Sequence, residues 1–287
     1  MLLTVPDEPA IRVRGLRKSY GAAEALRGVE FEVARGEVFG LLGPNGAGKT
    51  TTVEILEGYR ERTDGEVSVL GMDPGERSVE LRRRVGIVLQ STGIYRHITV
   101  REALIYFAGL YPHPRDVDEV IALAGLEGKE GERARKLSGG QLRRLDFALA
   151  LVGDPELVFL DEPTTGFDPA ARRNAWETIR SLRALGKTVL LTTHYLDEAQ
   201  ELADRVAIMR DGRIAVEGRP DELGGPGRYR VSWLEPDGTL AERETDDPTA
   251  LLHELTGRAL AAGRRLEGLS VGRPSLEDVY LELTADG

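Results

Sequence analysis

The chain has 287 residues, of which 41% are hydrophobic, and this suffices for one large domain with an ordinary core and a smaller unit beside it. Acidic side chains outnumber basic ones by 48 to 38, and the net charge of −10 disfavours binding to nucleic acid or to anionic lipid. The absence of cysteine excludes disulfides, thiolate zinc sites and thiol catalysis.

The N-terminal segment and the apolar runs do not predict membrane insertion. MLLTVPDEPA lacks a basic region and carries Asp7 and Glu8 where a secretory signal would be apolar. The run Phe147 to Val152 lies between Asp146 and Asp154, and it is far shorter than the roughly 18 to 20 apolar residues of a spanning helix. We therefore expect a cytoplasmic protein that reaches a membrane through a protein partner and has no nucleic-acid partner.

Strand-like apolar runs alternate with amphipathic helical stretches from about Arg12 to Arg219, which is the pattern of an α/β domain. Apolar runs without polar alternation are typical of a parallel sheet that is covered on both faces. Between Ser91 and Leu149 the spacing is helical, as in Val100 to Leu110 and Val117 to Leu126, which predicts a helical subdomain at about residues 91–149. The predicted buried strands are Val38 to Leu42, Val85 to Leu89, Leu157 to Leu160 and Thr188 to Thr192.

The last third of the chain predicts the end of the main domain and a second unit. Val206 to Met209 and Arg213 to Val216 flank Asp211-Gly212, a pair that suits the type I′ turn of a hairpin. The turn-rich segment Leu223 to Gly227 predicts a linker, so the main domain should cover residues 11–222. Residues 228–287 then form a small α+β accessory domain. Its predicted strands are Arg228 to Trp233 and Thr239 to Glu244, and its predicted helices are Pro248 to Ala261 and Pro274 to Thr284.

A glycine-rich segment fits the pattern G-x-x-x-x-G-K-[ST] and lies between the strand Val38 to Leu42 and the helical run Thr51 to Glu57. In such a loop, backbone N–H groups surround phosphate oxygens, Lys49 reaches the β- and γ-phosphates, and the Thr50 hydroxyl suits Mg²⁺. The loop by itself leaves kinases, GTPases and ATPases open. The nucleotide-binding candidates are Gly43, Pro44, Asn45, Gly46, Ala47, Gly48, Lys49, Thr50 and Thr51.

Two carboxylates, Asp161 and Glu162, directly follow the strand Leu157 to Leu160, at the end where parallel sheets place their ligands. Asp161 is suited to hold Mg²⁺, and Glu162 is suited to orient and deprotonate the water that attacks the γ-phosphate. GTPases of the Ras kind carry Asp-x-x-Gly at this place, so the sequence Asp161-Glu162-Pro163 favours an ATPase.

The segment LSGGQ, Leu137 to Gln141, precedes Asp161 by 20 residues and identifies the chain as a member of the ABC ATPase family, with a P-loop NTPase fold. Ser138, Gly139 and Gly140 at a helix start form a second anion-binding nest. In this family that nest, with Gln141, binds the γ-phosphate of an ATP held by another subunit. The resemblance therefore implies a two-fold homodimer that sandwiches two ATP molecules.

Four further residues match family motifs in order and spacing, and the resemblance extends over residues 11–222. Tyr20 resembles the aromatic residue that stacks on adenine, and Gln90 resembles the glutamine that reaches Mg²⁺ and the attacking water. His194 matches the histidine that contacts the γ-phosphate. Asp168 belongs to the segment TGFDP, which communicates across the dimer; many relatives carry serine and leucine at the two positions of this segment that hold Thr165 and Phe167 here.

The branch of the family follows from length and from two short segments. The chain holds a single cassette without the long insertions of DNA-repair relatives, since Lys49 and Asp161 are 112 residues apart. Leu56 to Tyr59 and Gly272 to Thr284 resemble bacterial drug-resistance exporters of the daunorubicin-resistance kind, whose ATPase pairs with a separate multi-helix permease. The resemblance implies export of a drug, antibiotic or other hydrophobic compound from the cytoplasmic face of the membrane. A soluble ABC ATPase with a non-transport or regulatory role is the alternative.

Overall fold

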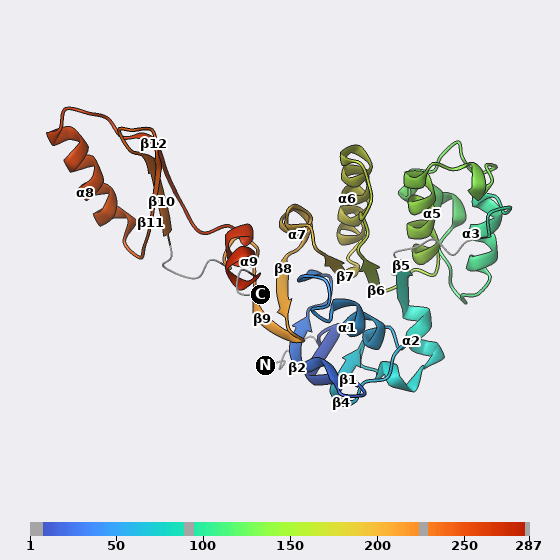
Figure 1. Ribbon diagram of the computed structural model, residues 1–287. Helices are drawn as coiled ribbons and strands as arrows, with labels where there is room; N and C mark the ends of the chain where they lie inside the picture. Colours follow the sequence, from blue (N-terminus) through green and yellow to red (C-terminus); the bar gives the residue numbers. More distant parts are fainter. Residues whose placement is uncertain (1–7, 89–94, 224–228, 285–287) are drawn as a thin grey trace, which may run out of the picture. The chain divides into compact units, whose positions relative to one another are not determined.

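The computed structural model describes residues 8–88, 95–223 and 229–284 (Figure 1). The chain divides between Glu217 and Gly218 into two compact units, which we call the first and the second unit.

The centre of the first unit is a six-stranded sheet in the order β5-β6-β7-β3-β8-β9. Its first five strands pair in parallel, which confirms the predicted parallel sheet (Figure 1). Leu89, the predicted end of β5, lies outside the described residues. The strands are β3 (Val38–Leu42), β5 (Val85–Val88), β6 (Leu157–Asp161), β7 (Thr188–Thr193), β8 (Arg205–Arg210) and β9 (Arg213–Gly218).

Both faces of this sheet are covered, which explains why its strands lack polar alternation. On β6 the fully buried Phe159 packs into one apolar cluster, whereas its neighbours Val158 and Leu160 pack into another. The first cluster includes side chains of α1 (Lys49–Leu56), and the second includes side chains of α5 (Gly139–Leu151), α6 (Pro169–Ala184) and α7 (Leu196–Leu202).

A second, antiparallel sheet in the order β2-β1-β4 was not predicted from the sequence. Its apolar side chains alternate along each strand, as Ile11 and Val13 do on β1, and they join the cluster that includes Phe159. This alternation was the available signal for the sheet. The strands are β1 (Ile11–Tyr20), β2 (Ala23–Val33) and β4 (Asp64–Val69).

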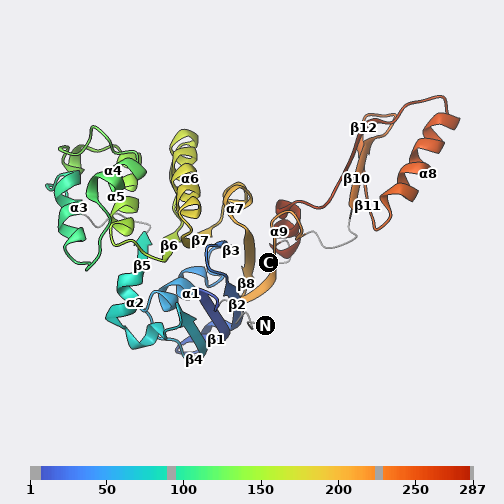
Figure 2. The same ribbon diagram turned by 180° about the vertical axis from the view of Figure 1, so that it is seen from behind.

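The predicted helical subdomain is confirmed: α3 (Val100–Ala108), α4 (Val117–Leu123) and α5 gather beside β5 (Figures 1 and 2). Each helix begins at a side chain that accepts backbone N–H groups, Thr99 for α3, Asp116 for α4 and Ser138 for α5. Their apolar faces form one cluster that includes Leu104, Ile121 and further side chains. The short helix η2 (Ala134–Lys136) precedes α5, and η1 (Pro74–Glu76) and α2 (Val79–Arg84) precede β5.

The turn between β8 and β9 has the predicted type. Asp211 and Gly212 have φ values of 50° and 74°, and positive φ at both central residues defines the type I′ turn. Among the described residues, no helix combines the length and the apolar character that crossing a bilayer requires.

The second unit is a small α+β structure, as predicted. Its three-stranded sheet has the order β11-β10-β12, and Val231 and Trp233 of β10 pack with Leu251 and Leu255 of α8. The strand β12 was missed, because its sequence EGLSVG has two glycines and Gly268 adopts φ 62° within it. The elements are β10 (Tyr229–Leu234), β11 (Leu240–Thr245), α8 (Pro248–Ala261), β12 (Glu267–Gly272) and α9 (Leu276–Thr284).

The stability of the first unit should depend on the apolar core beside β6. Phe159→Ala should lower the free energy of unfolding of this unit by about 3–5 kcal/mol, because truncating a fully buried ring leaves a cavity. Urea unfolding is followed by tryptophan fluorescence in a Trp233→Phe background. The chain has two tryptophans, so the signal then comes from Trp176 and reports the first unit alone. Leu110→Ala, at a side chain that is 60% exposed, is the control and should cost less than about 1 kcal/mol. Equal losses in the two variants would contradict the prediction.

Candidate functional site

The phosphate loop, residues 43–50, connects β3 with α1, and its glycines pack closely against β8 and β2. A Cβ atom on Gly43 would lie 2.5 Å from the Met209 carbonyl oxygen, and one on Gly48 would lie 2.6 Å from Leu26 Cδ2. Both glycines also have positive φ, 152° and 107°. A side chain at either position would therefore displace the loop.

Lys49 points back into this loop. Its side chain is 6% exposed, and Nζ donates hydrogen bonds to the carbonyl oxygens of Gly43 at 2.6 Å and Pro44 at 3.2 Å. Burial lowers the pKa of Lys49, while the charges of Glu162 and Asp161 oppose this shift. The ammonium group is thus held at the mouth of the loop with two carboxylates near it.

The two carboxylates lie at the end of β6, where the neighbouring strand β7 contacts them. Asp161 pairs with Thr192 in the parallel register, and the Thr192 hydroxyl donates a hydrogen bond of 2.6 Å to Asp161 Oδ1. Glu162 has φ 43°, a left-handed conformation that costs a residue with a side chain about 1–3 kcal/mol. Its N–H donates to the Thr192 hydroxyl oxygen at 3.0 Å and to the Thr192 carbonyl oxygen at 3.2 Å.

Thr165 and His194 contact the Glu162 carboxylate. The Thr165 hydroxyl donates to Oε2 at 3.0 Å. On the other side, His194 Nδ1 lies 3.4 Å from Oε1, a contact that lacks hydrogen-bond geometry, and Nδ1 has no hydrogen-bond partner within the described ranges. The histidine follows β7 directly, so β6 and β7 bring the acid and the imidazole together.

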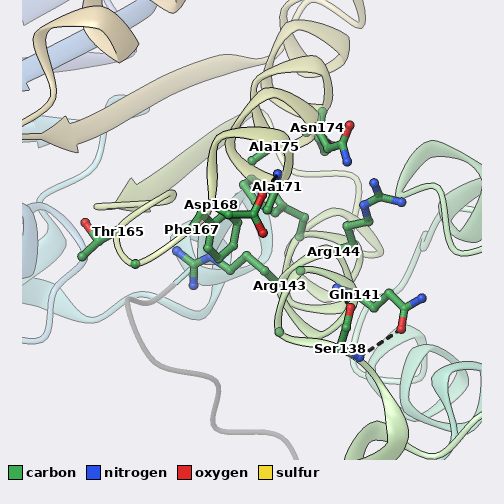
Figure 3. Close-up of a pocket in the computed structure, with 15 residues that line it drawn as sticks. Ser138, Gln141, Arg143, Arg144, Thr165, Phe167, Asp168, Ala171, Asn174 and Ala175 are labelled. Carbon is green, nitrogen blue, oxygen red and sulfur yellow. Dashed lines mark hydrogen bonds between the residues drawn. The ribbon is translucent and has the colours of Figure 1, made fainter.

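The LSGGQ segment lies in a different place, on a cavity of ≈ 620 Å³ (Figure 3). The Ser138 hydroxyl accepts the Gln141 N–H, and the Gln141 side chain accepts the Ser138 N–H, so the two residues cap α5 reciprocally. Thr165, Phe167 and Asp168 also line the cavity. Among the described residues that line it, none belongs to the phosphate loop.

Gly139 and Gly140 have open space around them on this cavity. A Cβ atom on Gly139 would meet no heavy atom within 4 Å, and one on Gly140 would meet only the Ala171 Cβ, at 3.9 Å. The fold of the chain itself therefore has room for a methyl group at both positions. Both glycines instead leave the start of α5 accessible to a molecule in the cavity.

Tyr20 ends β1, and the residue is 43% exposed. The Lys18 Nζ lies 5.2 Å from the ring centroid, and the Arg60 guanidinium lies 5.3 Å from it, so two cations face the aromatic ring. Arg60 is held by Glu54 at 2.5 Å. Gln90, the remaining predicted site residue, lies outside the described residues.

Comparisons with known proteins give the family. The model of the ABC transporter family matches residues 26–165. The Nod factor export ATP-binding protein I of Rhizobium sp. (strain N33) is 41% identical over 300 residues, which cover 96% of this chain and 97% of the relative. The chain belongs to the ATP-binding subunits of ABC transporters.

Solved ABC structures agree with the fold. The cbiO1 subunit from Clostridium perfringens is 29% identical and has a TM-score of 0.69, with 75% of this chain and 90% of that chain covered. The dimeric structure of MJ0796, a bacterial ABC transporter cassette, is 25% identical and has a TM-score of 0.64, with 73% and 98% covered. The chain is therefore an ATPase with the P-loop NTPase fold that its sequence predicts.

This ABC subunit also has site features that motif matching missed or interpreted differently. Thr192 contacts both acidic residues, yet only the pairing of β6 with β7 shows it. Thr165, where many relatives carry serine, was interpreted from the sequence as relevant to contacts across the dimer. In the structure its hydroxyl donates a hydrogen bond to Glu162 of the same chain. Glu57, which follows α1, has a buried Oε1 without a hydrogen-bond partner among the described residues. Burial, with the charges of Asp161 and Glu54, raises its pKa to about 8.

The phosphate role of Lys49 can be tested by binding. Lys49→Ala should weaken ATP binding about 10- to 100-fold, because charge-assisted hydrogen bonds from the ammonium group are lost. Isothermal titration calorimetry measures the affinity, and thermal unfolding checks that the variant is folded. Lys129→Ala, which also removes one positive charge, is the control. An unchanged ATP affinity in Lys49→Ala would refute the role.

The raised pKa of Glu57 predicts a pH-dependent stability difference. A carboxyl group with pKa about 8 when folded and 4.5 when unfolded stabilises the fold fully below pH 4.5, and this contribution is lost as the pH rises to 8. Glu57→Gln does not ionise, so its stability relative to the wild type should increase by about 3 kcal/mol between pH 5.5 and 9. Urea unfolding at both pH values measures this difference. The surface variant Glu80→Gln controls for net charge, and a pH-independent difference for Glu57→Gln would contradict the prediction.

Proposed function

We propose that this chain is the ATP-hydrolysing subunit of a transporter that exports a drug, an antibiotic or another hydrophobic compound through a separate permease. The observation that carries the proposal is the convergence of Lys49, Asp161, Glu162 and His194 at the carboxyl edge of one sheet. Export is supported by the Rhizobium relative, whose name describes it as the ATP-binding protein of Nod factor export. In this proposal residues 11–222 are the ABC cassette and residues 228–287 are the accessory domain.

ATP would lie with its adenine on the Tyr20 ring and its phosphates in the phosphate loop. The nearby oxygen donors, the Thr50 hydroxyl and the Asp161 carboxylate, fit Mg²⁺, which prefers hard oxygen ligands. The described residues contain no cluster of three or more His, Cys, Asp or Glu side chains suited to a metal ion. In this proposal Gln90 would also contribute to the Mg²⁺ site, which phosphates and water would complete. When bound, Mg²⁺ neutralises charge on the phosphates.

Glu162 acts as the base in this proposal. Its carboxylate, held by Thr165 through Oε2, accepts the proton of the water that attacks the γ-phosphate. The His194 imidazole, next to Oε1, contacts the γ-phosphate oxygens. Lys49 stabilises the charge that accumulates on the β–γ bridging region as ADP leaves. Asp161 would hold the metal beside the phosphates.

A second copy of the chain completes each ATP site. Within one chain the LSGGQ cavity and the phosphate loop share no described lining residue. In a two-fold dimer, Ser138, Gly139, Gly140 and Gln141 of the partner subunit would face the γ-phosphate, and the dimeric MJ0796 structure supports such an assembly. The open space around the two glycines fits the close approach of a phosphate group.

The permease would contact a groove of ≈ 290 Å³ between α1, β5 and the helical subdomain. Its lining is apolar apart from Glu57, Arg82 and the hydroxyl groups of Tyr59 and Tyr111, and the buried Oε1 of Glu57 has no hydrogen-bond partner there among the described residues. A short permease helix with a hydrogen-bond donor would fill the groove and satisfy this oxygen. The subunit would then bind at the cytoplasmic face of the membrane.

The decisive experiment is purification of the tagged Glu162→Gln chain from native membranes in Mg²⁺ and ATP. Without its base the chain should hydrolyse ATP at least about 100-fold more slowly, remain dimeric in ATP and carry a multi-helix membrane protein with it. Mass spectrometry identifies the partner, and phosphate release measures turnover. The double variant Lys49→Ala with Glu162→Gln is the control and should not dimerise in ATP. Near-normal turnover would refute the assigned base, and a dimer without a membrane partner would refute transport.

A further inference from the structure

Thr192 is the penultimate residue of β7, and none of the family motifs quoted above includes it. Its side chain is completely buried, with 0% exposure. The parallel pairing of β6 with β7 sets it opposite Asp161. It also lies two residues before His194, which directly follows β7, so it connects the two acids with the strand that leads to the histidine.

The Thr192 hydroxyl makes one hydrogen bond to each of the two acidic residues. Its proton goes to Asp161 Oδ1 at 2.6 Å, and its oxygen accepts the Glu162 N–H at 3.0 Å. A hydroxyl carries one proton and two lone pairs, so it can serve both partners at once. One oxygen atom therefore links the side chain of Asp161 to the backbone of Glu162.

This link constrains the orientation of the Asp161 carboxylate and the backbone conformation of Glu162, and hydrolysis would require both. Asp161 Oδ1 is fixed in direction by the donated hydrogen bond, which leaves Oδ2 for other ligands. Glu162 has a left-handed backbone conformation with φ 43°, and the hydroxyl accepts the N–H of this residue together with the Thr192 carbonyl oxygen. Loss of the hydroxyl would release the Asp161 carboxylate and weaken the constraint on the Glu162 backbone.

We propose that Thr192 is a positioning residue that holds Asp161 in the orientation for Mg²⁺ and Glu162 in the orientation for the attacking water. The inference rests on the roles proposed above for these two acids. Groups in the second layer around a metal ligand typically change metal affinity or activity about 10- to 100-fold when they are removed.

A buried threonine can also matter for packing alone, and the same strand supplies a matched control. Thr188, at the start of β7, is 3% exposed, and its hydroxyl accepts the Gly36 N–H at 2.9 Å. Thr188→Val and Thr192→Val thus each remove one buried hydroxyl and one hydrogen-bond acceptor from the same strand. They differ in that Thr192 contacts the acids.

The first measurement is steady-state ATP hydrolysis. Thr192→Val should lower kcat about 10- to 100-fold and change the KM for ATP less than about threefold, whereas Thr188→Val should keep kcat within about threefold of the wild type. Thr192→Ser keeps the hydroxyl and should retain most of the wild-type kcat. Thr192→Ala differs from Thr192→Ser by one oxygen atom and should lose activity as Thr192→Val does. If packing alone mattered, valine would retain activity and serine would lose it.

The second measurement does not depend on turnover. In the Glu162→Gln background, calorimetry gives the ATP affinity with Mg²⁺ and with EDTA, and the ratio of the two reports the contribution of the metal. Thr192→Val should lower this ratio about tenfold and Thr188→Val should leave it unchanged. Equal ratios and equal rates in the two variants would overturn the positioning role. If Glu162→Gln in otherwise wild-type protein hydrolysed ATP as fast as the wild type, the proposed function itself would be refuted instead.

Discussion

The parallel pairing of β6, β7 and β3 is the constraint on which the candidate site depends. Parallel strands end at one edge of a sheet, so the phosphate loop after β3, the acids at the end of β6 and His194 after β7 emerge side by side. The register cannot slip, because Val158, Phe159 and Leu160 are buried on alternate faces and a shift of one residue would exchange those faces. The core thereby sets the relative positions of groups that are far apart in the chain.

The same edge concentrates features that oppose folding. Burial disfavours the charge of Lys49, and Glu162 adopts a left-handed backbone conformation. Neither of these is required by the sheet, whose interior strands are apolar and regular. Such costs gather where a site must hold charged groups ready for a ligand, which is why we interpret them as functional.

Sequence patterns predicted the parts of this structure that depend on local chemistry. The buried strands, the phosphate loop and the Asp211-Gly212 turn each follow from residues that are adjacent in the chain. The role of Thr192 could not be predicted in this way, because its hydroxyl meets Asp161 across 31 residues and only through the strand register. Likewise, β12 escaped prediction because its glycines suppress the strand pattern. Gln90 lies outside the described residues, so its predicted role stays a prediction.

The glycines of the two segments that the sequence predicts to bind phosphate differ in a way that bears on the proposed dimer. Gly43 and Gly48 are required by their own chain, since a Cβ atom at either position would collide with neighbouring atoms. Gly139 and Gly140 are under no such internal constraint, because a Cβ atom there would contact at most one atom, at 3.9 Å. Packing therefore explains the first pair and not the second. The open space at Gly139 and Gly140 instead fits the proposed ATP bound to a second copy, whose terminal phosphate would approach the start of α5.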